Sequence, residues 1–247
     1  MLWTNSSISA LFLQSEKTYI CTMKTLHLLC LILLPLLTGC IEIIDDLSLN
    51  TDGSGTFKYT INLSSSKVKV NSLLALDSLD GKKVPSIQDI SAKTDEIVDL
   101  LKCRNGISNV SFSADYDNFI FKLSCDFNSL EALQKAIREV VKVENGYKEV
   151  PELDHHWLSF EDDVLVRSIP QITVRKTREI NPEDRDLLKT GTYTSITRFE
   201  SEVERCENPS CSISKNKKAV MVRTNTYSLT QNPNLLDNTI YLTKSEN

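Results

Sequence analysis

The sequence predicts an α+β fold: an antiparallel sheet built from ββα units with helices on one face, followed by a β-rich C-terminal part. Two observations support the first part. Pairs of segments with alternating apolar and polar residues recur, and segments of helical apolar spacing follow them. A third observation supports the second part, where segments rich in Thr and Val are separated by turn residues. We expect such a sheet to bury one face and to leave the other in water.

The first 39 residues are predicted to be absent from the mature fold. An apolar run at residues 26–37 is shorter than the roughly 20 residues that a membrane-spanning helix needs. It follows Lys24 and precedes small residues, which is the pattern of a secretory signal peptide. We assign the signal peptide to residues 23–39. Residues 1–22 are then an upstream extension outside the native product, and the alternative is a long translated region that is removed with the signal.

The signal ends in Leu37-Thr38-Gly39-Cys40, which resembles the lipobox of bacterial lipoproteins. The resemblance implies diacylglycerol on the Cys40 sulfur, cleavage before Cys40 and an anchor made of acyl chains. The alternative is a buried N-terminal helix that happens to end at Cys40. We therefore expect a protein of the bacterial cell envelope, on the outer-membrane or periplasmic side rather than in the cytoplasm, with the membrane as its first partner.

The charge balance argues against one class of partner. The chain has 28 basic and 33 acidic residues, a net charge of −5, and no basic stripe. Nucleic acid is not a predicted partner, because proteins bind its phosphates with clustered Lys and Arg that release counterions. The same acidity disfavours electrostatic attachment of the chain as a whole to anionic lipid, so the acyl chains are expected to do the anchoring.

Residues 40–147 are predicted to form a ββα–ββα module. Strands at 41–50 and 56–64 flank an Asp-Gly turn, and helix-compatible segments follow at 66–78 and 91–103. A second hairpin spans residues 106–127, after which residues 128–131 resemble a capping box that starts another helix. This helix places its apolar residues on one stripe: Leu130, Leu133, Ile137, Val140 and Val141.

Residues 148–247 are predicted to form the β-rich C-terminal region. A polar stretch at residues 144–160 is the predicted boundary or long connection. Strands are predicted at 164–166, 171–175, 193–205, 217–227 and 238–242, with a short helix that starts at residues 181–183 and ends at Gly191. The sequence leaves open whether this region is a separate domain or completes the first sheet.

Four cysteines follow Cys40, and an even number in an exported chain suggests two disulfides. We expect Cys103 to pair with Cys125 and Cys206 with Cys211, because each pair lies within one supersecondary unit. The second pair is interpreted as a clip across the end of a hairpin, and a free buried thiol pair is the alternative. Its spacing is not the Cys-x-x-Cys of a redox catalyst.

Motifs that would indicate catalysis are missing from the sequence, including the nucleophile elbow, the zinc-protease helix and nucleotide-binding loops. His155 and His156, with Glu152 and Asp154, could form a surface metal site. Adjacent residues of an extended segment point opposite ways, however, so we expect a solvated loop there and no metal site.

Asp45 and Asp46 are interpreted as polar positions on the first strand rather than as an acid–base pair. We therefore predict no catalytic residue, no metal ligand and no cofactor. The predicted site residues are Cys40 for lipidation and the four cysteines of the two disulfides.

The mature part has an acidic-aliphatic first strand after Cys40, the hairpin DGSGTFKYTINLS, and a second hairpin that runs from GISNV to FIFKLSCDF. In these features it resembles a group of poorly characterised bacterial envelope lipoproteins that includes the LppM type. The resemblance covers most of residues 40–143 and, more weakly, residues 193–227. It implies an envelope-facing role in contact with lipids or other envelope components, and it carries over no catalytic residue.

We therefore expect a lipid-anchored envelope protein that acts as a non-catalytic binding or structural module, with a lipid or an envelope protein as a further partner. The alternatives are an envelope hydrolase whose site residues are scattered in the sequence, or an accessory subunit of an enzyme. A pocket lined by apolar residues would favour binding, whereas His or Cys beside a nucleophile in a cleft would favour an enzyme.

Overall fold

A computed structural model describes residues 41–79, 81–146, 148, 150–169 and 188–244. Several predictions fall outside these residues: the signal peptide, the lipobox with Cys40, the strand at 171–175 and the helix start at 181–183. Within the described part, no helix is both long and apolar enough to cross a bilayer.

The first predicted hairpin is present. Strand β1 (Glu42–Leu49) pairs with antiparallel β2 (Gly55–Asn62). The turn between them is held by Asp52, whose carboxylate accepts a hydrogen bond from the Ser54 backbone N–H at 2.9 Å. Gly53 has a φ of 81°, a left-handed conformation that glycine adopts without strain. The Asp-Gly signal in the sequence therefore identified a real turn.

The connection between the two hairpins contains the predicted helices. A short 3-10 turn, η2 (Ser64–Ser66), leads into α2 (Lys67–Leu74), and a small hairpin of β3 (Ser78–Leu79) and β4 (Lys82–Lys83) follows. Helix α3 (Ile87–Lys102) begins four residues before the predicted start at residue 91. The reason is a capping box, in which the Ser86 side chain accepts from the Asp89 backbone and Asp89 accepts from the Ser86 backbone.

The second hairpin and its helix also match the prediction. Strand β5 (Ile107–Asp115) pairs with β6 (Ile120–Phe127), and β6 also pairs with β2. Helix α4 (Leu130–Glu144) starts after Ser129, whose hydroxyl accepts from the Ala132 backbone N–H at 3.1 Å. The stripe predicted on this helix faces the core: Leu130 and Leu133 are buried in it, and the other three stripe residues pack against it.

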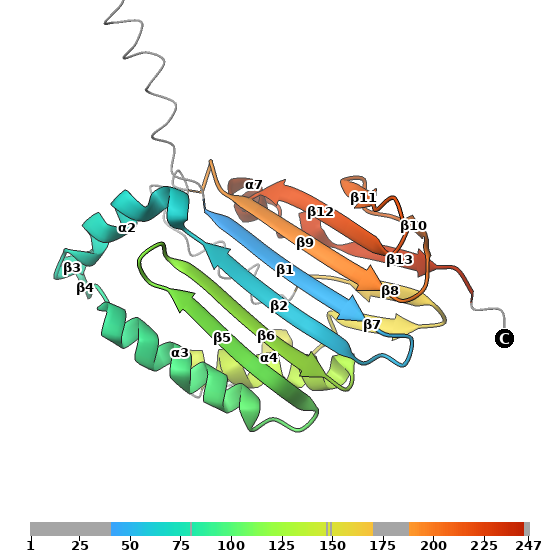
Figure 1. The fold of residues 1–247 in the computed structure, drawn as a ribbon, viewed down its shortest axis with the longest axis horizontal. Helices are drawn as coiled ribbons and strands as arrows, with labels where there is room; N and C mark the ends of the chain where they lie inside the picture. The colour runs from blue at the N-terminus through green and yellow to red at the C-terminus, as the bar shows by residue number, and fades with distance from the viewer. Residues whose placement is uncertain (1–40, 80, 147, 149, 170–187, 245–247) are drawn as a thin grey trace, which may run out of the picture. The chain divides into compact units, whose positions relative to one another are not determined.

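The C-terminal region adds three strands to the same sheet. These are β9 (Thr192–Phe199), β11 (Cys211–Ile213) and β12 (Ala219–Asn225), which give a seven-stranded sheet of order β11-β12-β9-β1-β2-β6-β5. Strand β9 runs parallel to β1, and the other pairs are antiparallel. Strands from residues 40–147 and from residues 148–247 thus share one sheet (Figure 1).

The remaining strands form a second, four-stranded antiparallel sheet in the order β10-β13-β8-β7. They are β7 (Leu158–Glu161), β8 (Val164–Arg167), β10 (Val203–Cys206) and β13 (Asn238–Leu242). Strand β7 lies partly within residues 144–160, which we expected to be a polar connection, so that expectation is wrong at its C-terminal end. Leu158 is buried there, and Phe160 packs against the core. Short helical segments complete the fold: η3 (Pro151–Leu153), α7 (Thr226–Gln231) and η4 (Pro233–Leu236).

The large sheet has one covered and one open face, as predicted. Helix α4 and strands β7, β8 and β13 lie behind the sheet in Figure 1, and α3 packs along β5. The core lies between these layers. It joins residues of the large sheet, of α4 and of the small sheet, including Leu47, Leu49, Cys125, Leu133, Leu165, Val220, Ile240 and Leu242. Both helices cover the same face, because side chains of α3 and of α4 both lie over Tyr59 and Leu123 of the sheet.

Only one of the two predicted disulfides is formed. Cys206 and Cys211 are bonded. They do not clip a hairpin, however, because β10 pairs with β13 and β11 pairs with β12, so the bond joins the edges of the two sheets. Cys103 and Cys125 are free thiols, which corrects the expected pairing. Cys125 lies buried on the covered face of β6, whereas Cys103 is exposed in the turn after α3.

Candidate functional site

Asp45 is the least expected residue of the covered face. In β1 the residues at odd positions point towards the second layer, so Asp45 lies between Ile43 and Leu47 and is only 2% exposed. Asp46, its neighbour, points to the open face. Both carboxylates lie on the first strand, as predicted, but we did not foresee that the alternation of the strand places Asp45 inside.

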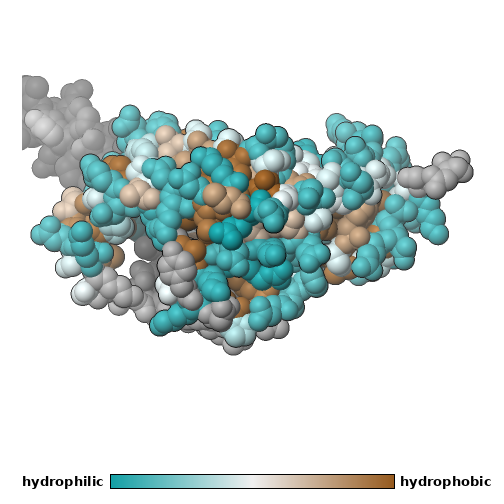
Figure 2. Space-filling model, turned by 90° about the horizontal axis from the view of Figure 1, so that it is seen from below, coloured by the Kyte–Doolittle hydropathy of each residue, from teal (hydrophilic) through white to brown (hydrophobic). Residues whose placement is uncertain are grey.

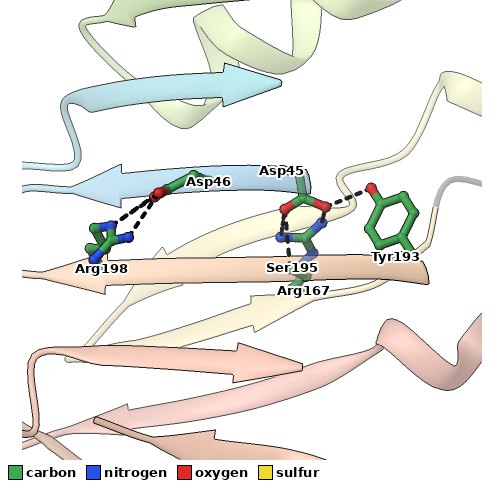
Figure 3. Close-up of polar contacts among 6 residues, drawn as sticks. All are labelled: Asp45, Asp46, Arg167, Tyr193, Ser195 and Arg198. Atoms are coloured by element: carbon green, nitrogen blue, oxygen red, sulfur yellow. Dashed lines mark hydrogen bonds and ion pairs between the residues drawn. The ribbon is translucent and has the colours of Figure 1, made fainter. Parts of the chain in front are cut away.

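Three side chains saturate the Asp45 carboxylate (Figure 3). Arg167 of β8 donates through both terminal nitrogens at 2.9 Å, one to each carboxylate oxygen. The Tyr193 hydroxyl donates to one oxygen at 2.5 Å, and the Ser195 hydroxyl donates to the other at 3.1 Å. A carboxylate offers about four acceptor positions, and these described residues occupy four. The arrangement ties β1, β9 and β8 together across the two sheets.

The electrostatics of this cluster follow from its burial. Burial raises the pKa of Tyr193 well above its ordinary value, and the Asp45 charge acts in the same direction. Burial works to lower the pKa of Arg167, but Asp45 outweighs it, so that pKa is raised and the guanidinium stays charged. Tyr59 on β2 lies opposite Asp45, and burial together with Asp45 raises its pKa to about 12. At neutral pH the cluster holds one buried ion pair and neutral phenols.

The open face carries a matching but solvated pair. Arg198 of β9 donates to both oxygens of Asp46 at 3.0–3.1 Å, and the Arg198 side chain is half exposed (Figure 3). The two adjacent aspartates thus make the same type of bond in two different environments. Asp46 is therefore a matched control for substitutions of Asp45.

An apolar cavity lies beside the buried ion pair, between the large sheet and α4. Its volume is 500 Å³. Its walls come from β1, β2 and β6 of the sheet, from α4, and from the segments around Trp157 and η4. We call it the apolar cavity; its apolar lining includes Leu47, Phe57, Leu123, Leu133, Ile137, Val140, Val141, Trp157, Leu229, Pro233 and Leu236.

The charged side chains in its wall are Asp45 and Arg167, which bind each other. A second cavity of 360 Å³ lies between α3 and the same sheet face, and Tyr59 and Leu123 belong to both linings. On the side of the molecule drawn in Figure 2, brown apolar residues show between teal hydrophilic ones. Cavities of about 300–1,000 Å³ with mainly apolar walls are typical ligand sites.

The histidine pair does not belong to this site. His155 is half buried, with its ring 6.1 Å from that of Trp157 at a steep angle, and His156 is exposed. Neither lines the apolar cavity. Among the residues that the structure describes, no group of three or more His, Cys, Asp or Glu side chains could hold a metal ion.

Sequence reasoning missed the partners of Asp45 and the role of Gln134. Gln134 on α4 is 1% exposed; its amide donates to the Leu158 carbonyl and accepts from the Trp157 and Leu158 backbone N–H groups. One signal for the ion pair was available. A carboxylate at an apolar position of an alternating strand needs a buried cation, although the sequence does not say which one.

Comparisons with known proteins find a similar solved structure but no matching family. No family model matches the chain, and no curated protein matches it. Among solved structures, the chain is similar to the NMR structure of the folded domain of LppM from Mycobacterium tuberculosis. The alignment has 10% identity and a TM-score of 0.37, and it covers 85% of this chain and 94% of that domain.

Proposed function

We propose that this protein is a lipid-anchored, non-catalytic binding protein of the bacterial cell envelope, and that its ligand carries an apolar chain. The observation that carries this proposal is the apolar cavity, whose 500 Å³ lie between a sheet and a helix and are bounded mainly by aliphatic and aromatic side chains. An envelope lipid, or another amphiphile with an acyl chain, fits such a wall because burial of its methylene groups is favourable.

The charges near the cavity support an uncharged ligand chain. Asp45 and Arg167 neutralise each other, so the wall offers no unpaired charge that a ligand ion would have to compensate. The same saturation argues against a catalytic role for Asp45, since its lone pairs are engaged by three neighbours. The Ser195 hydroxyl donates a hydrogen bond to Asp45, and of the described residues that line the cavity none is a histidine that could act as a base.

Native mass spectrometry of the detergent-released protein tests the ligand. We expect adducts with the mass of an amphiphile that are lost in organic solvent, whereas the covalent anchor persists. Ile137→Trp, on the cavity side of α4, should weaken ligand affinity by about 5- to 150-fold and so lower adduct occupancy, because overpacking a filled site costs about 1–3 kcal/mol. Lys135→Trp, on the exposed side of the same helix, should leave occupancy unchanged. A protein without adducts, or equal loss in both variants, would contradict the proposal.

The anchor is tested at Cys40. Cys40→Ala should abolish labelling by an alkyne fatty acid and release the protein from membranes, because the thioether forms on this sulfur. His155→Ala with His156→Ala should change neither membrane attachment nor adduct occupancy. Equal labelling of the wild type and the Cys40 variant would remove the basis for the envelope location.

A further inference from the structure

The connection between β2 and α3, residues 64–87, starts beside the point where the anchor would leave the fold. Strand β2 is antiparallel to β1, and its last residue, Asn62, pairs with Glu42 at the start of β1. Figure 1 shows α2, β3 and β4 lying beyond this end of the sheet. Glu42 is two residues from Cys40, a separation of at most about 7 Å along an extended chain. An anchor on Cys40 would therefore bring this end of the sheet to the membrane.

Exposed apolar side chains gather in the same connection. The described residues include seven large apolar side chains that are exposed, and four of them lie between residues 68 and 87. Val68 on α2 is 82% exposed, the highest value of the seven, and Leu76 and Leu79 are 44% and 45% exposed. Helix α2 has no buried residue. Single exposed apolar residues are common, but such a concentration marks an interaction surface.

The charge of this connection differs from that of the chain. Residues 64–87 contain four lysines and two aspartates, whereas the whole chain has a net charge of −5. Lys69 is exposed on α2 next to Val68, and the Lys83 side chain is 82% exposed although it lies 3.7 Å from Asp89. Lys67 lies near Asp115; hydrogen bonds from Asn118 are the main cause that lowers the pKa of this carboxyl, and the Lys67 charge acts in the same direction. Apolar tips with lysines beside them are the composition of interfacial membrane-binding segments.

We infer that residues 64–87 form a membrane-docking segment, in which Val68, Leu76 and Leu79 enter the boundary between headgroups and acyl chains of an anionic phospholipid bilayer. The inference rests on the proposed anchor at Cys40, which fixes the end of the fold that meets the lipid. At the left end of Figure 2, where Figure 1 places β3 and β4, brown and tan atoms lie among teal ones. The segment would orient the anchored domain and would hold it close to the bilayer.

Tryptophan fluorescence tests this inference. The mature chain has a single tryptophan, Trp157, which is 5% exposed and provides a constant background. The lipidated Val68→Trp and Leu79→Trp variants are reconstituted into vesicles of phosphatidylethanolamine and phosphatidylglycerol, some of them made with brominated acyl chains. We expect a blue shift and a loss of roughly half or more of the added emission in brominated vesicles, since interfacial side chains lie about 5–10 Å deep.

Ile213→Trp is the matched control, because Ile213 is 39% exposed on the edge strand β11. Through Val220 and Thr197 it is in register with Leu47, about 17 Å further along β1 than Glu42. Its added emission should not be quenched. Folding of each variant is checked by its thermal midpoint, and Leu76→Trp replaces a variant that fails to fold.

The outcomes separate this inference from the proposed function. If the unsubstituted protein floats with vesicles but Val68→Trp and Leu79→Trp are not quenched, the docking segment is disproved and the anchor stands. A blue shift of the added tryptophan emission in native membranes, but not in lipid vesicles, would point to a protein partner. This result would also overturn the inference. If the unsubstituted protein does not float, the anchor fails and the docking segment fails with it.

Discussion

At the residue scale, Asp45 and Asp46 show how a single position along a strand decides the role of a carboxylate. Both aspartates bind an arginine with two oxygens, yet one pair is buried between the sheets and the other faces solvent. In a buried ion pair, the attraction between the two charges offsets their loss of hydration. Removing one partner destabilises the protein, because the other charge stays buried without compensation. The buried pair links β1 of the large sheet to β8 of the small sheet, and the exposed pair is expected to contribute little to stability.

Asp45→Asn should destabilise the protein by about 3–5 kcal/mol, because the variant leaves the Arg167 guanidinium buried without its counter-charge. Asp46→Asn, the matched control on the same strand, should cost no more than about 1 kcal/mol. Denaturant unfolding of both variants measures the difference. Replacing Asp45 by Leu and Arg167 by Met, together with Tyr193→Phe and Ser195→Ala so that no hydroxyl loses its acceptor, should restore most of the stability, and failure of this combined variant would indicate a role for the charges beyond packing.

At the element scale, local patterns predicted the hairpins and helices, but not the pairing of distant elements. The Asp-Gly turn and the alternation of β2 identified the first hairpin, and the apolar stripe identified α4. The parallel contact of β9 with β1 joins residues about 150 positions apart, as in the pair Asp45 and Ser195, and no local signal encodes it. Cysteine spacing is also a local signal. It correctly suggested the Cys206–Cys211 bond, but it wrongly suggested Cys103–Cys125, because spacing does not say where each side chain lies in the packed fold.

Gly106, between α3 and β5, illustrates a constraint that only the packed structure reveals. Its φ is 82°, and a Cβ there would lie 2.4 Å from the Asn128 side-chain oxygen and 2.7 Å from the Ala132 Cβ. Gly106→Ala should cost about 2–4 kcal/mol, because steric overlap adds to the strain of a left-handed alanine. Gly146→Ala, where φ is 67° and no atom lies within 4 Å, should cost only about 1 kcal/mol. Equal thermal midpoints for both variants would contradict this account.

At the scale of the whole molecule, one sheet face supports both the packing of the second layer and the apolar cavity. Strand β1 lies in the middle of the large sheet, with β2 on one side and β9 on the other. Its inward residues contribute to the ion pair, through Asp45, and to the cavity wall, through Leu47. Changes that weaken the ion pair should therefore also loosen the wall, so that stability and ligand occupancy are coupled.

The pH dependence of global stability follows from the buried phenols beside this wall. In the folded protein burial and Asp45 raise the pKa of Tyr59 to about 12, whereas the unfolded chain has the ordinary value near 10. The neutral phenol is favoured by folding, so its contribution is complete below pH 10 and is lost as pH rises towards 12. Tyr59 alone should account for about 2 kcal/mol of the stability lost by pH 12.

Unfolding midpoints in urea, measured from about pH 8 upwards, should fall less steeply for Tyr59→Phe than for the wild type. Comparing the two proteins removes the shared effect of lysine deprotonation. The wild type should retain part of its fall after this substitution, because burial also raises the pKa of Tyr193. Parallel pH profiles for the two proteins would mean that Tyr59 ionises without penalty, and the cavity wall around it would then be open to water rather than closed and apolar.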